Sequence, residues 1–408
     1  MSIKNLKSYL LSDSFLYIVT CIYMITLLLG NVVYYFTTPA FEITIKCIRI
    51  ICYIIFGFSI IRNWKNGESI SVGMVVFAIL SCVIAFFSKN KDLIFLFVFC
   101  FAVKKLSFKK IITYTLIIYI IIFLTIVNLA LLRIIPDWIF YRGDTQRHSL
   151  GFYYSTIAIG IYLSCTLMYF YVRKSKATVM ELLLFEIINF FLYKYTDGRL
   201  SFILISIILF MMLILKIPQI RQIFKLQRMQ VLLEYIGYIL PISLFLIVIF
   251  ATYLYSKGNP IGIAINKILS GRLLYTKNAF QQYGITLFGQ PIDWRGWGGF
   301  GYVNTENMSG FIYNYVDISY VRILFDYGII PTIIILLVYT VALVKSVKEK
   351  NYWIFTALVF VCIWSSIEPY LFNVGKNIFI LSFVPIFNIG TIRQLDYNCI
   401  KSKFKKES

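Results

Sequence analysis

Long runs of apolar residues, separated by short polar stretches, repeat along the whole chain. Most of these runs reach the roughly 17–25 residues that a helix needs to cross a hydrocarbon layer of about 30 Å. They lack the alternation of apolar and polar positions that is typical of membrane β-strands. We therefore predict membrane spans, the fourth being the shortest, at 15–35, 42–61, 70–87, 93–103, 111–132, 155–172, 179–195, 200–215, 232–251, 321–344, 352–368 and 377–391.

This pattern predicts an all-α polytopic integral membrane protein with about 12 transmembrane helices. The composition agrees, because the 408 residues are 60% hydrophobic and only 14% charged, which is far from the balance of soluble domains. The run at 15–35 follows Lys4 and Lys7 and is long enough to span, so we interpret it as an uncleaved signal anchor. Residues 1–408 are interpreted as a single transmembrane domain.

The formal net charge of +21 is carried largely by basic clusters that lie between the apolar runs. These clusters fall on one side of the membrane if both termini are cytoplasmic, as the positive-inside rule requires. The charges therefore orient the protein and face anionic lipid heads. Nucleic-acid binding is the weaker interpretation of the positive charge, and no nucleic-acid partner is predicted.

Two connections on the predicted outer side are longer than the others. One is moderate, at 133–154, and the other, at 252–320, is long and rich in Tyr, Trp, Phe and Ile. Long loops are usually functional or disordered, and this composition is not that of a disordered segment. We therefore expect the loop at 252–320 to be structured and to fold against the mouth of the membrane domain. Residues 392–408 form the predicted basic cytoplasmic tail.

Three arginines on the predicted outer side are candidate ligands for an anion, namely Arg147, Arg199 and Arg272. An arginine at a membrane mouth is costly in free energy unless a carboxylate, a carbonyl or a ligand anion pairs with it. Its planar fork of donors suits phosphate oxygens. The alternative is that each arginine extends to the interface or pairs with an aspartate, the candidates being Asp144, Asp197, Asp293 and Asp317.

Two further residues are candidates for proton transfer. His148 is the only histidine, and histidine is the side chain best able to hold a proton near neutral pH; the alternative is a structural role. Asp317 precedes the span at 321–344, where it either orients an arginine, activates an acceptor hydroxyl or belongs to a capped helix start. The spacing of Arg322 and Asp326 permits an ion pair within that helix.

Other patterns are explained without a cofactor. The eight cysteines show no metal-ligand spacing, so neither a metal site nor disulfides are predicted. The stretch GWGGFG at 296–301 matches a dinucleotide fingerprint only formally, because it does not lie between a strand and a helix. Glu42, Lys46 and Arg49 lie on one face of the second predicted span, where mutual pairing accounts for their charges.

An ordered series of short motifs over roughly residues 140–345 resembles the bacterial repeat-unit polymerases of O-antigen and capsule biosynthesis (Wzy-type), within the O-antigen ligase and polymerase superfamily. The motifs are RHSLGFYYST, TDGRLSFIL, LSGRLLYTKNAF with LFGQ after it, and VDISYVRILFDYGII. The chain departs from the family pattern at Ile318, where Asn is usual, and at Tyr153–Tyr154, where His-Pro or Asn-Pro is common.

The resemblance implies a GT-C-like, metal-independent glycosyltransferase in the bacterial inner (plasma) membrane that uses no nucleotide-sugar. The donor would be an oligosaccharide on undecaprenyl pyrophosphate at the outer face, and the acceptor would be the terminal sugar of a second lipid-linked unit. Flippase and chain-length regulator proteins would be partners. Arginines would stabilise the pyrophosphate, with Arg272 and Arg199 first and Arg147 and His148 next. His148 or Asp317 would be the general base.

Two alternatives to the polymerase remain open at this stage. A ligase of the same superfamily, of O-antigen or teichoic type, would transfer a finished glycan to another acceptor. A flippase or transporter of the lipid-linked unit would carry charges in the middle of its spans, lining a cavity. Most basic residues lie at the predicted ends of the spans, which favours chemistry at the outer face over transport.

Overall fold

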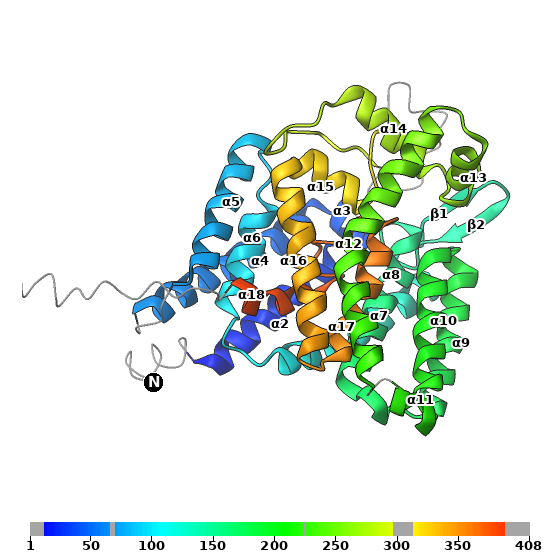
Figure 1. Cartoon of the computed structure of the whole chain (residues 1–408). Coiled ribbons are helices and arrows are strands. Elements are labelled where there is room, and N and C mark those ends of the chain that lie inside the picture. The colour runs from blue at the N-terminus through cyan, green and yellow to red at the C-terminus, as the bar shows by residue number, and fades with distance from the viewer. Residues whose placement is uncertain (1–11, 66–69, 224–225, 297–312, 388–408) are drawn as a thin grey trace, which may run out of the picture.

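The computed structural model describes residues 12–65, 70–223, 226–296 and 313–387 (Figure 1). It is mostly helical, at 75%, with few strands. Lys4, Lys7, the predicted tail at 392–408 and all but the first residue of the stretch at 296–301 lie outside the described residues.

The elements follow the predicted apolar runs closely. In chain order they are α2 (Asp13–Leu29), α3 (Val33–Thr37), α4 (Pro39–Lys65), α5 (Val72–Ser88), α6 (Asp92–Ala102), α7 (Phe108–Leu131), β1 (Ile139–Arg142), β2 (Thr145–His148), α8 (Ser155–Arg173), η1 (Lys174–Lys176), α9 (Val179–Thr196), α10 (Arg199–Ile214), α11 (Pro218–Ile223), α12 (Gln227–Ser256), α13 (Pro260–Ile268), α14 (Arg272–Gln282), α15 (Ser319–Tyr327), α16 (Ile329–Lys348), α17 (Tyr352–Ser365), η3 (Ile378–Phe383) and α18 (Val384–Phe387).

Five helical segments in the described residues are long and apolar enough to cross a membrane: Pro39–Lys65, Phe108–Leu131, Ser155–Lys176, Gln227–Ser256 and Ile329–Lys348. Six shorter apolar helical segments accompany them, at Asp13–Leu29, Val72–Ser88, Asp92–Ala102, Arg199–Ile214, Tyr352–Ser365 and Ile378–Phe387. The all-α class of membrane protein is therefore supported, and twelve crossings stay a prediction.

Three predicted spans do not form single α-helices in the structure. The run at 15–35 divides into α2 and α3, and the described part of the run at 377–391 forms η3 and α18. The run at 321–344 forms two helices, α15 and α16, that meet at Gly328, whose φ of 87° and ψ of 176° are accessible essentially to glycine alone. The break brings the backbone of the preceding loop into contact with α16. The amide of Ile329 donates to the carbonyl of Thr286 at 3.0 Å, so the end of the long loop is fixed to the start of this span.

Replacing Gly328 with alanine is expected to destabilise the fold. A Cβ there would lie 2.4 Å from the amide nitrogen of Gly289, and the backbone strain alone costs about 1–3 kcal/mol. Thermal unfolding in detergent measures the effect as a lower midpoint. Gly57→Ala is the control, because Gly57 is helical with no atom within 4 Å of an added Cβ, and it should leave the midpoint unchanged or raise it. Equal midpoints for wild type and Gly328→Ala would refute the close approach.

Both connections that are predicted to lie on the outer side contain regular structure at one end of the bundle, and α11 lies at the opposite end (Figure 1). β1 and β2 form an antiparallel hairpin in which Ile139 pairs with His148. The predicted loop at 252–320 begins with the last turn of α12 and continues into α13 and α14. Asn259 caps α13 by accepting from the amide of Ile261 at 2.9 Å, and Pro260 follows as the first residue of the helix.

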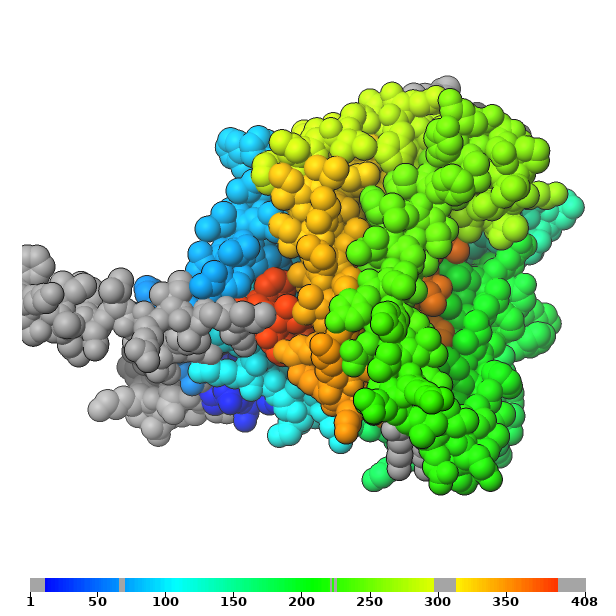
Figure 2. All heavy atoms as spheres, in the orientation of Figure 1, coloured from blue at the N-terminus to red at the C-terminus, as the bar shows by residue number. Residues whose placement is uncertain are grey.

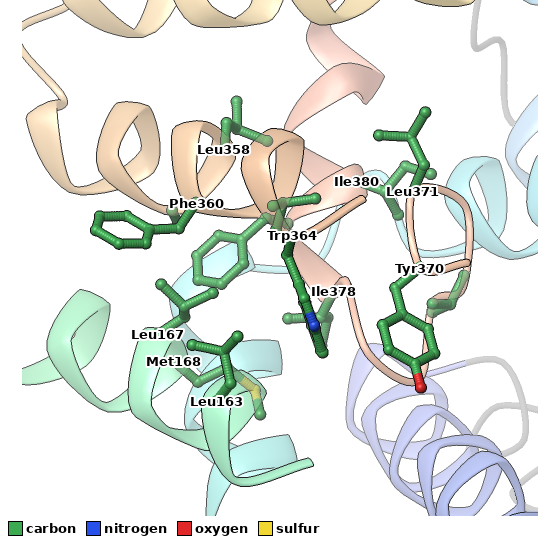
Figure 3. Close-up of a cluster of buried hydrophobic side chains, with 14 of the residues drawn as sticks. Leu163, Leu167, Met168, Leu358, Phe360, Trp364, Tyr370, Leu371, Ile378 and Ile380 are labelled. Atoms are coloured by element: carbon green, nitrogen blue, oxygen red, sulfur yellow. The ribbon is translucent and has the colours of Figure 1, made fainter. Parts of the chain in front are cut away.

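The core joins α8, α17 and the segment that follows α17. Trp364 is fully buried, and Figure 3 shows it between Leu163 of α8 and the side chains of Tyr370 and Ile378. The rings of Trp364 and Tyr370 are 4.6 Å apart. α8 accommodates Trp364 at Gly160, where an added Cβ would lie 3.2 Å from the indole. This packing fixes the irregular segment 366–377.

Hydrogen bonds hold the same segment against α15 and α16. Ser319, the first residue of α15, donates from its hydroxyl to the carbonyl of Glu368 at 2.7 Å and accepts from the amide of Leu371 at 3.2 Å. Asn377 donates to the carbonyl of Leu371 at 2.8 Å and to the hydroxyl of Tyr339 at 3.0 Å. Buried hydrogen-bond networks rigidify a core, so the backbone at Glu368 has a defined position.

Candidate functional site

Arg272 lies between two carboxylates at the start of α14. Its Nη2 is 2.7 Å from Oε1 of Glu368, and its Nε is 3.6 Å from Oδ2 of Asp317. The side chain is only 15% exposed. This is the pairing that a buried arginine requires, and it combines residues from the long loop, from the start of α15 and from the segment after α17.

The local sequence explains how Arg272 reaches this position. Ser270 and Gly271 both have positive φ, at 54° and 87°, so the chain turns sharply between α13 and α14. Asn266 then accepts from the amides of Leu273 and Leu274, at 3.0 and 3.2 Å, and so satisfies donors at the start of α14. The Ser-Gly-Arg sequence thus places the arginine on the first turn of a short capped helix.

Glu368 and Asp317 form an acidic pair that shares Arg272. Burial raises the pKa of the Glu368 carboxyl to about 7, against the opposing attraction of Arg272. Burial likewise raises the pKa of Asp317 above its usual value, against the attraction of Arg272 and Arg322. Both carboxyl groups therefore hold a proton more readily than exposed acids do.

Arg147 is the second buried arginine of the site. It is 3% exposed, its Nε donates to the carbonyl of Thr196 at 3.0 Å, and its guanidinium lies 5.7 Å from the centre of the Tyr154 ring. Its charge acts on Glu368, whose pKa burial raises and Arg272 and Arg147 lower. Arg147 Nη2 and Arg272 Nε make no hydrogen bond within the described residues, although Arg272 Nε faces Asp317 at 3.6 Å. The Nη2 donor of Arg147 therefore remains available to an acceptor.

Arg199 occupies a more exposed position than Arg147. It pairs with Asp197 at 3.1 Å, and its side chain is 56% exposed. Asp197 also accepts from Arg142 at 3.0 Å. The short turn before α10 is therefore an arginine-rich rim in which one carboxylate holds two arginines. Of the three arginines predicted from the sequence, Arg147 and Arg272 act on the same carboxylate, Glu368, whereas Arg199 pairs with Asp197.

His148 is held by Asp137 on the hairpin. Its Nδ1 lies 2.6 Å from Oδ2 of Asp137, so the proton on Nδ1 is donated to the carboxylate. Asp137 also accepts from the amide of Leu150 at 2.7 Å. The imidazole ring of His148 forms an edge contact with the ring of Tyr195, with 5.4 Å between the two centroids. The contacts suit a fixed imidazole at the base of the hairpin, with Nε2 as the nitrogen that can act on a ligand.

Lys376 adds a buried cation beneath Glu368. The residue is 3% exposed, and its Nζ lies 5.7 Å from the centre of the Tyr370 ring. Burial lowers the pKa of this amine to about 7, against the attraction of Cys165 and Glu368. Neither Glu368 nor Lys376 was singled out from the sequence. Their positions after an apolar run, in a segment of few charges, are the signal that points to them.

Two ion pairs that the sequence suggested are present. Arg322 and Asp326 are 3.3 Å apart within α15, and Lys46 and Glu42 are 2.5 Å apart within α4. Arg49 differs from the expected mutual pairing, because its donors turn away from Glu42 and contact the carbonyl and hydroxyl of Thr26 in α2.

Within the described residues, no group of three histidine, cysteine, aspartate or glutamate side chains lies close enough to hold a metal ion. Comparison of the chain with protein-family models, curated proteins and solved structures finds no match. The function therefore has to be argued from the chemistry of the buried arginines and carboxylates, together with the sequence motifs that carry them.

The raised pKa of Glu368 predicts a pH dependence of stability. The folded protein holds this proton up to about pH 7, whereas an ordinary glutamate releases it near 4.5. The stabilisation is therefore complete below about pH 4.5 and is lost as pH rises through about 7. We expect the thermal midpoint to fall over this window and to fall less in Glu368→Gln. Glu349→Gln, at an exposed position, should retain the wild-type slope; an identical slope in Glu368→Gln would contradict the assignment.

Proposed function

We propose that the protein is a polysaccharide polymerase that transfers a growing glycan from undecaprenyl pyrophosphate to the terminal sugar of another lipid-linked unit. The observation that carries the proposal is the pair of buried arginines, Arg272 and Arg147, which both act electrostatically on Glu368 and each have a buried N–H donor that makes no hydrogen bond within the described residues. A buried donor without an acceptor is costly, and a pyrophosphate supplies acceptors with the complementary charge.

The proposed reaction needs stabilisation of the leaving group and removal of one proton. The bond between the anomeric carbon and the pyrophosphate oxygen breaks, and negative charge grows on that oxygen. Arg272 and Arg147 stabilise this charge because they are fixed before the reaction. The acceptor hydroxyl forms the new bond to the anomeric carbon and loses its proton to a general base. Asp317 suits that role, since burial raises the pKa of this carboxyl toward the range of effective bases.

Other residues take supporting roles in this proposal. Glu368 positions Arg272 through the 2.7 Å contact. Arg199, on the exposed rim with Asp197, meets the phosphates or sugars as they approach. His148 is the alternative general base, and its tautomer is set by Asp137. The apolar helices hold the polyprenyl tails in the bilayer.

The sequence motifs supply the remaining features of the proposal. They imply a GT-C-like enzyme in a bacterial plasma membrane with the site at the outer face. The apolar runs and the distribution of basic residues predict about 12 spans and cytoplasmic termini. Each of the polymerase motifs contains or adjoins a residue of the site: Arg147, Arg199, Arg272 and Asp317. The flippase alternative receives less support, because the two buried arginines that act on Glu368, Arg147 and Arg272, lie in the hairpin and in α14 rather than in the helices long enough to span a membrane.

A deletion strain tests the proposal and separates a polymerase from a ligase. Loss of a polymerase leaves single repeat units attached to the final acceptor. Loss of a ligase leaves long chains on the lipid carrier. We expect single units, with long chains restored by the wild-type gene in trans. Long chains stranded on the carrier would overturn the polymerase in favour of the ligase.

A further inference from the structure

A cavity of about 520 Å³ lies beside the Arg272 site, between α2, α4, α6, α15 and the segment after α17. Its wall includes Ser319, whose hydroxyl donates to the carbonyl of Glu368, and Tyr153 and Tyr370. The same wall includes Arg322, which acts electrostatically on Asp317. The cavity and the Arg272 site are thus neighbours, with the proposed base near both.

Arg49 is the unusual residue of this cavity. It lies in α4, one of the membrane-spanning helices, and contacts only an uncharged partner, Thr26, through its carbonyl at 2.8 Å and its hydroxyl at 3.5 Å. No carboxylate in the described part of the chain forms a salt bridge with it. An arginine at membrane depth is normally paired or belongs to a ligand site, so Arg49 calls for an anion that the protein itself does not provide.

Most of the other charges of the cavity are paired. Three cationic residues line it, Lys46, Arg49 and Arg322, against two carboxylates, Asp92 and Asp326. Asp326 pairs with Arg322 at 3.3 Å, and Lys46 pairs outside the lining with Glu42. The guanidinium of Arg322 is further held 4.5 Å from the centre of the Tyr315 ring. Arg49 is thus the cation of this lining without a carboxylate partner among the described residues, and Asp92 is the carboxylate that opposes an incoming anion.

The surroundings of the cavity favour a lipid over a free anion. Ile50 and Phe95, from the apolar helices α4 and α6, line it and are 57% and 38% exposed, so apolar side chains remain uncovered along the cavity. A second chamber adjoins it, lined wholly by apolar side chains, and the two share Leu96 and Phe372. The surface of α18, beside this chamber, is visible between α5 and α16 in Figure 2.

We infer that this cavity binds the phosphate-bearing head of a second long-chain lipid, with the first part of its tail in the adjoining apolar chamber. The identity of that lipid as the acceptor unit rests on the proposed function, which requires two lipid-linked substrates at once. Arg49 and Arg322 hold the phosphate oxygens of this second lipid, and its glycan reaches past Tyr153 and Tyr370 toward Asp317.

Native mass spectrometry of the purified full chain tests the inference with undecaprenyl pyrophosphate as the probe. Wild type is expected to bind two lipids per chain, and Arg49→Gln is expected to lose one or to bind it at least about tenfold more weakly, since a charged bidentate donor is removed. Arg62→Gln is the matched control in the same helix, outside this cavity, and should bind two. Inorganic pyrophosphate at the same concentration should not displace the second lipid.

Two results would overturn the inference: a single lipid on wild type, or two lipids with unchanged affinity on Arg49→Gln. Displacement of the second lipid by inorganic pyrophosphate would show that the cavity binds a free anion, and it would overturn the inference as well. If Arg49→Gln folds poorly, Arg49→Lys replaces it in the test, because lysine keeps the charge and lacks the bidentate fork of donors. Weaker binding of the second lipid to Arg49→Lys supports the site, and unchanged affinity for that lipid refutes it. If binding of the second lipid depends on Arg49 but the protein has no polymerase activity, only the proposed function is refuted. If the protein polymerises repeat units but lipid binding does not depend on Arg49, only this inference is refuted.

Discussion

Arg272→Ala is expected to reduce polymer formation by about 10²-fold to 10³-fold, the loss typical when one fixed donor to a developing negative charge is removed. Arg272 is the residue that joins Glu368 and Asp317, at 2.7 and 3.6 Å. Its removal takes away the stabilisation of the pyrophosphate leaving group and leaves two buried carboxyl groups without their shared cation. The rate of chain growth on lipid-linked repeat units measures the effect.

Arg295→Ala is the matched control for this variant. Arg295 lies in the same loop and also pairs with an aspartate, Asp293, at 2.9 Å, but its side chain is 58% exposed. It should retain wild-type activity, because exposed ion pairs contribute little. Arg272→Lys should lie between alanine and wild type, since lysine keeps the charge and loses the bidentate fork. Wild-type chain growth by a folded Arg272→Ala protein would remove Arg272 from the site.

Asp317→Asn is expected to lower the rate of transfer by about 10²-fold to 10⁴-fold, the usual contribution of a positioned general base. Asparagine keeps the shape of the side chain and cannot take the proton of the acceptor hydroxyl. Binding of the lipid-linked donor should change far less than the rate. Asp293→Asn, at a 77% exposed position of the same loop, is the control and should leave both unchanged.

The pH profile separates Asp317 from His148 as the base. Burial raises the pKa of Asp317, and a base works only when deprotonated, so the wild-type rate should rise with pH until this carboxyl has ionised. The rising limb should be lost in Asp317→Asn and kept in His148→Gln. The opposite pattern, with the limb lost in His148→Gln alone, would assign the base to the histidine that Asp137 holds.

The positions of the helices could be predicted because a membrane span needs a continuous apolar run of fixed length. The run at 155–172 corresponds to α8, Ser155–Arg173, and the run at 179–195 to α9, Val179–Thr196. The break at Gly328 was missed, because hydropathy does not distinguish one long helix from two joined by a residue of positive φ. The hairpin has a two-residue Gly-Asp turn at 143–144, which is a sequence pattern typical of β-hairpins.

The site could be predicted in part. Arg272 and its aspartate, Asp317, were candidates from the sequence, because an arginine at a membrane mouth needs an anion. Glu368 could not be paired with Arg272 in this way, since 96 residues separate them and their contact depends on how the segment after α17 packs against α15. The sequence likewise leaves the partner of Arg199 open among several aspartates, and the structure shows that Arg199 pairs with Asp197.

The most direct measurement is chain growth by the purified protein in detergent, with a synthetic undecaprenyl-pyrophosphate-linked repeat unit as the sole sugar substrate. We predict a ladder of glycans on the lipid carrier that lengthens with time, without any nucleotide-sugar, and that is lost in Arg272→Ala while Arg295→Ala retains it. Repeat units that stay single with folded wild-type protein would contradict the proposed polymerase.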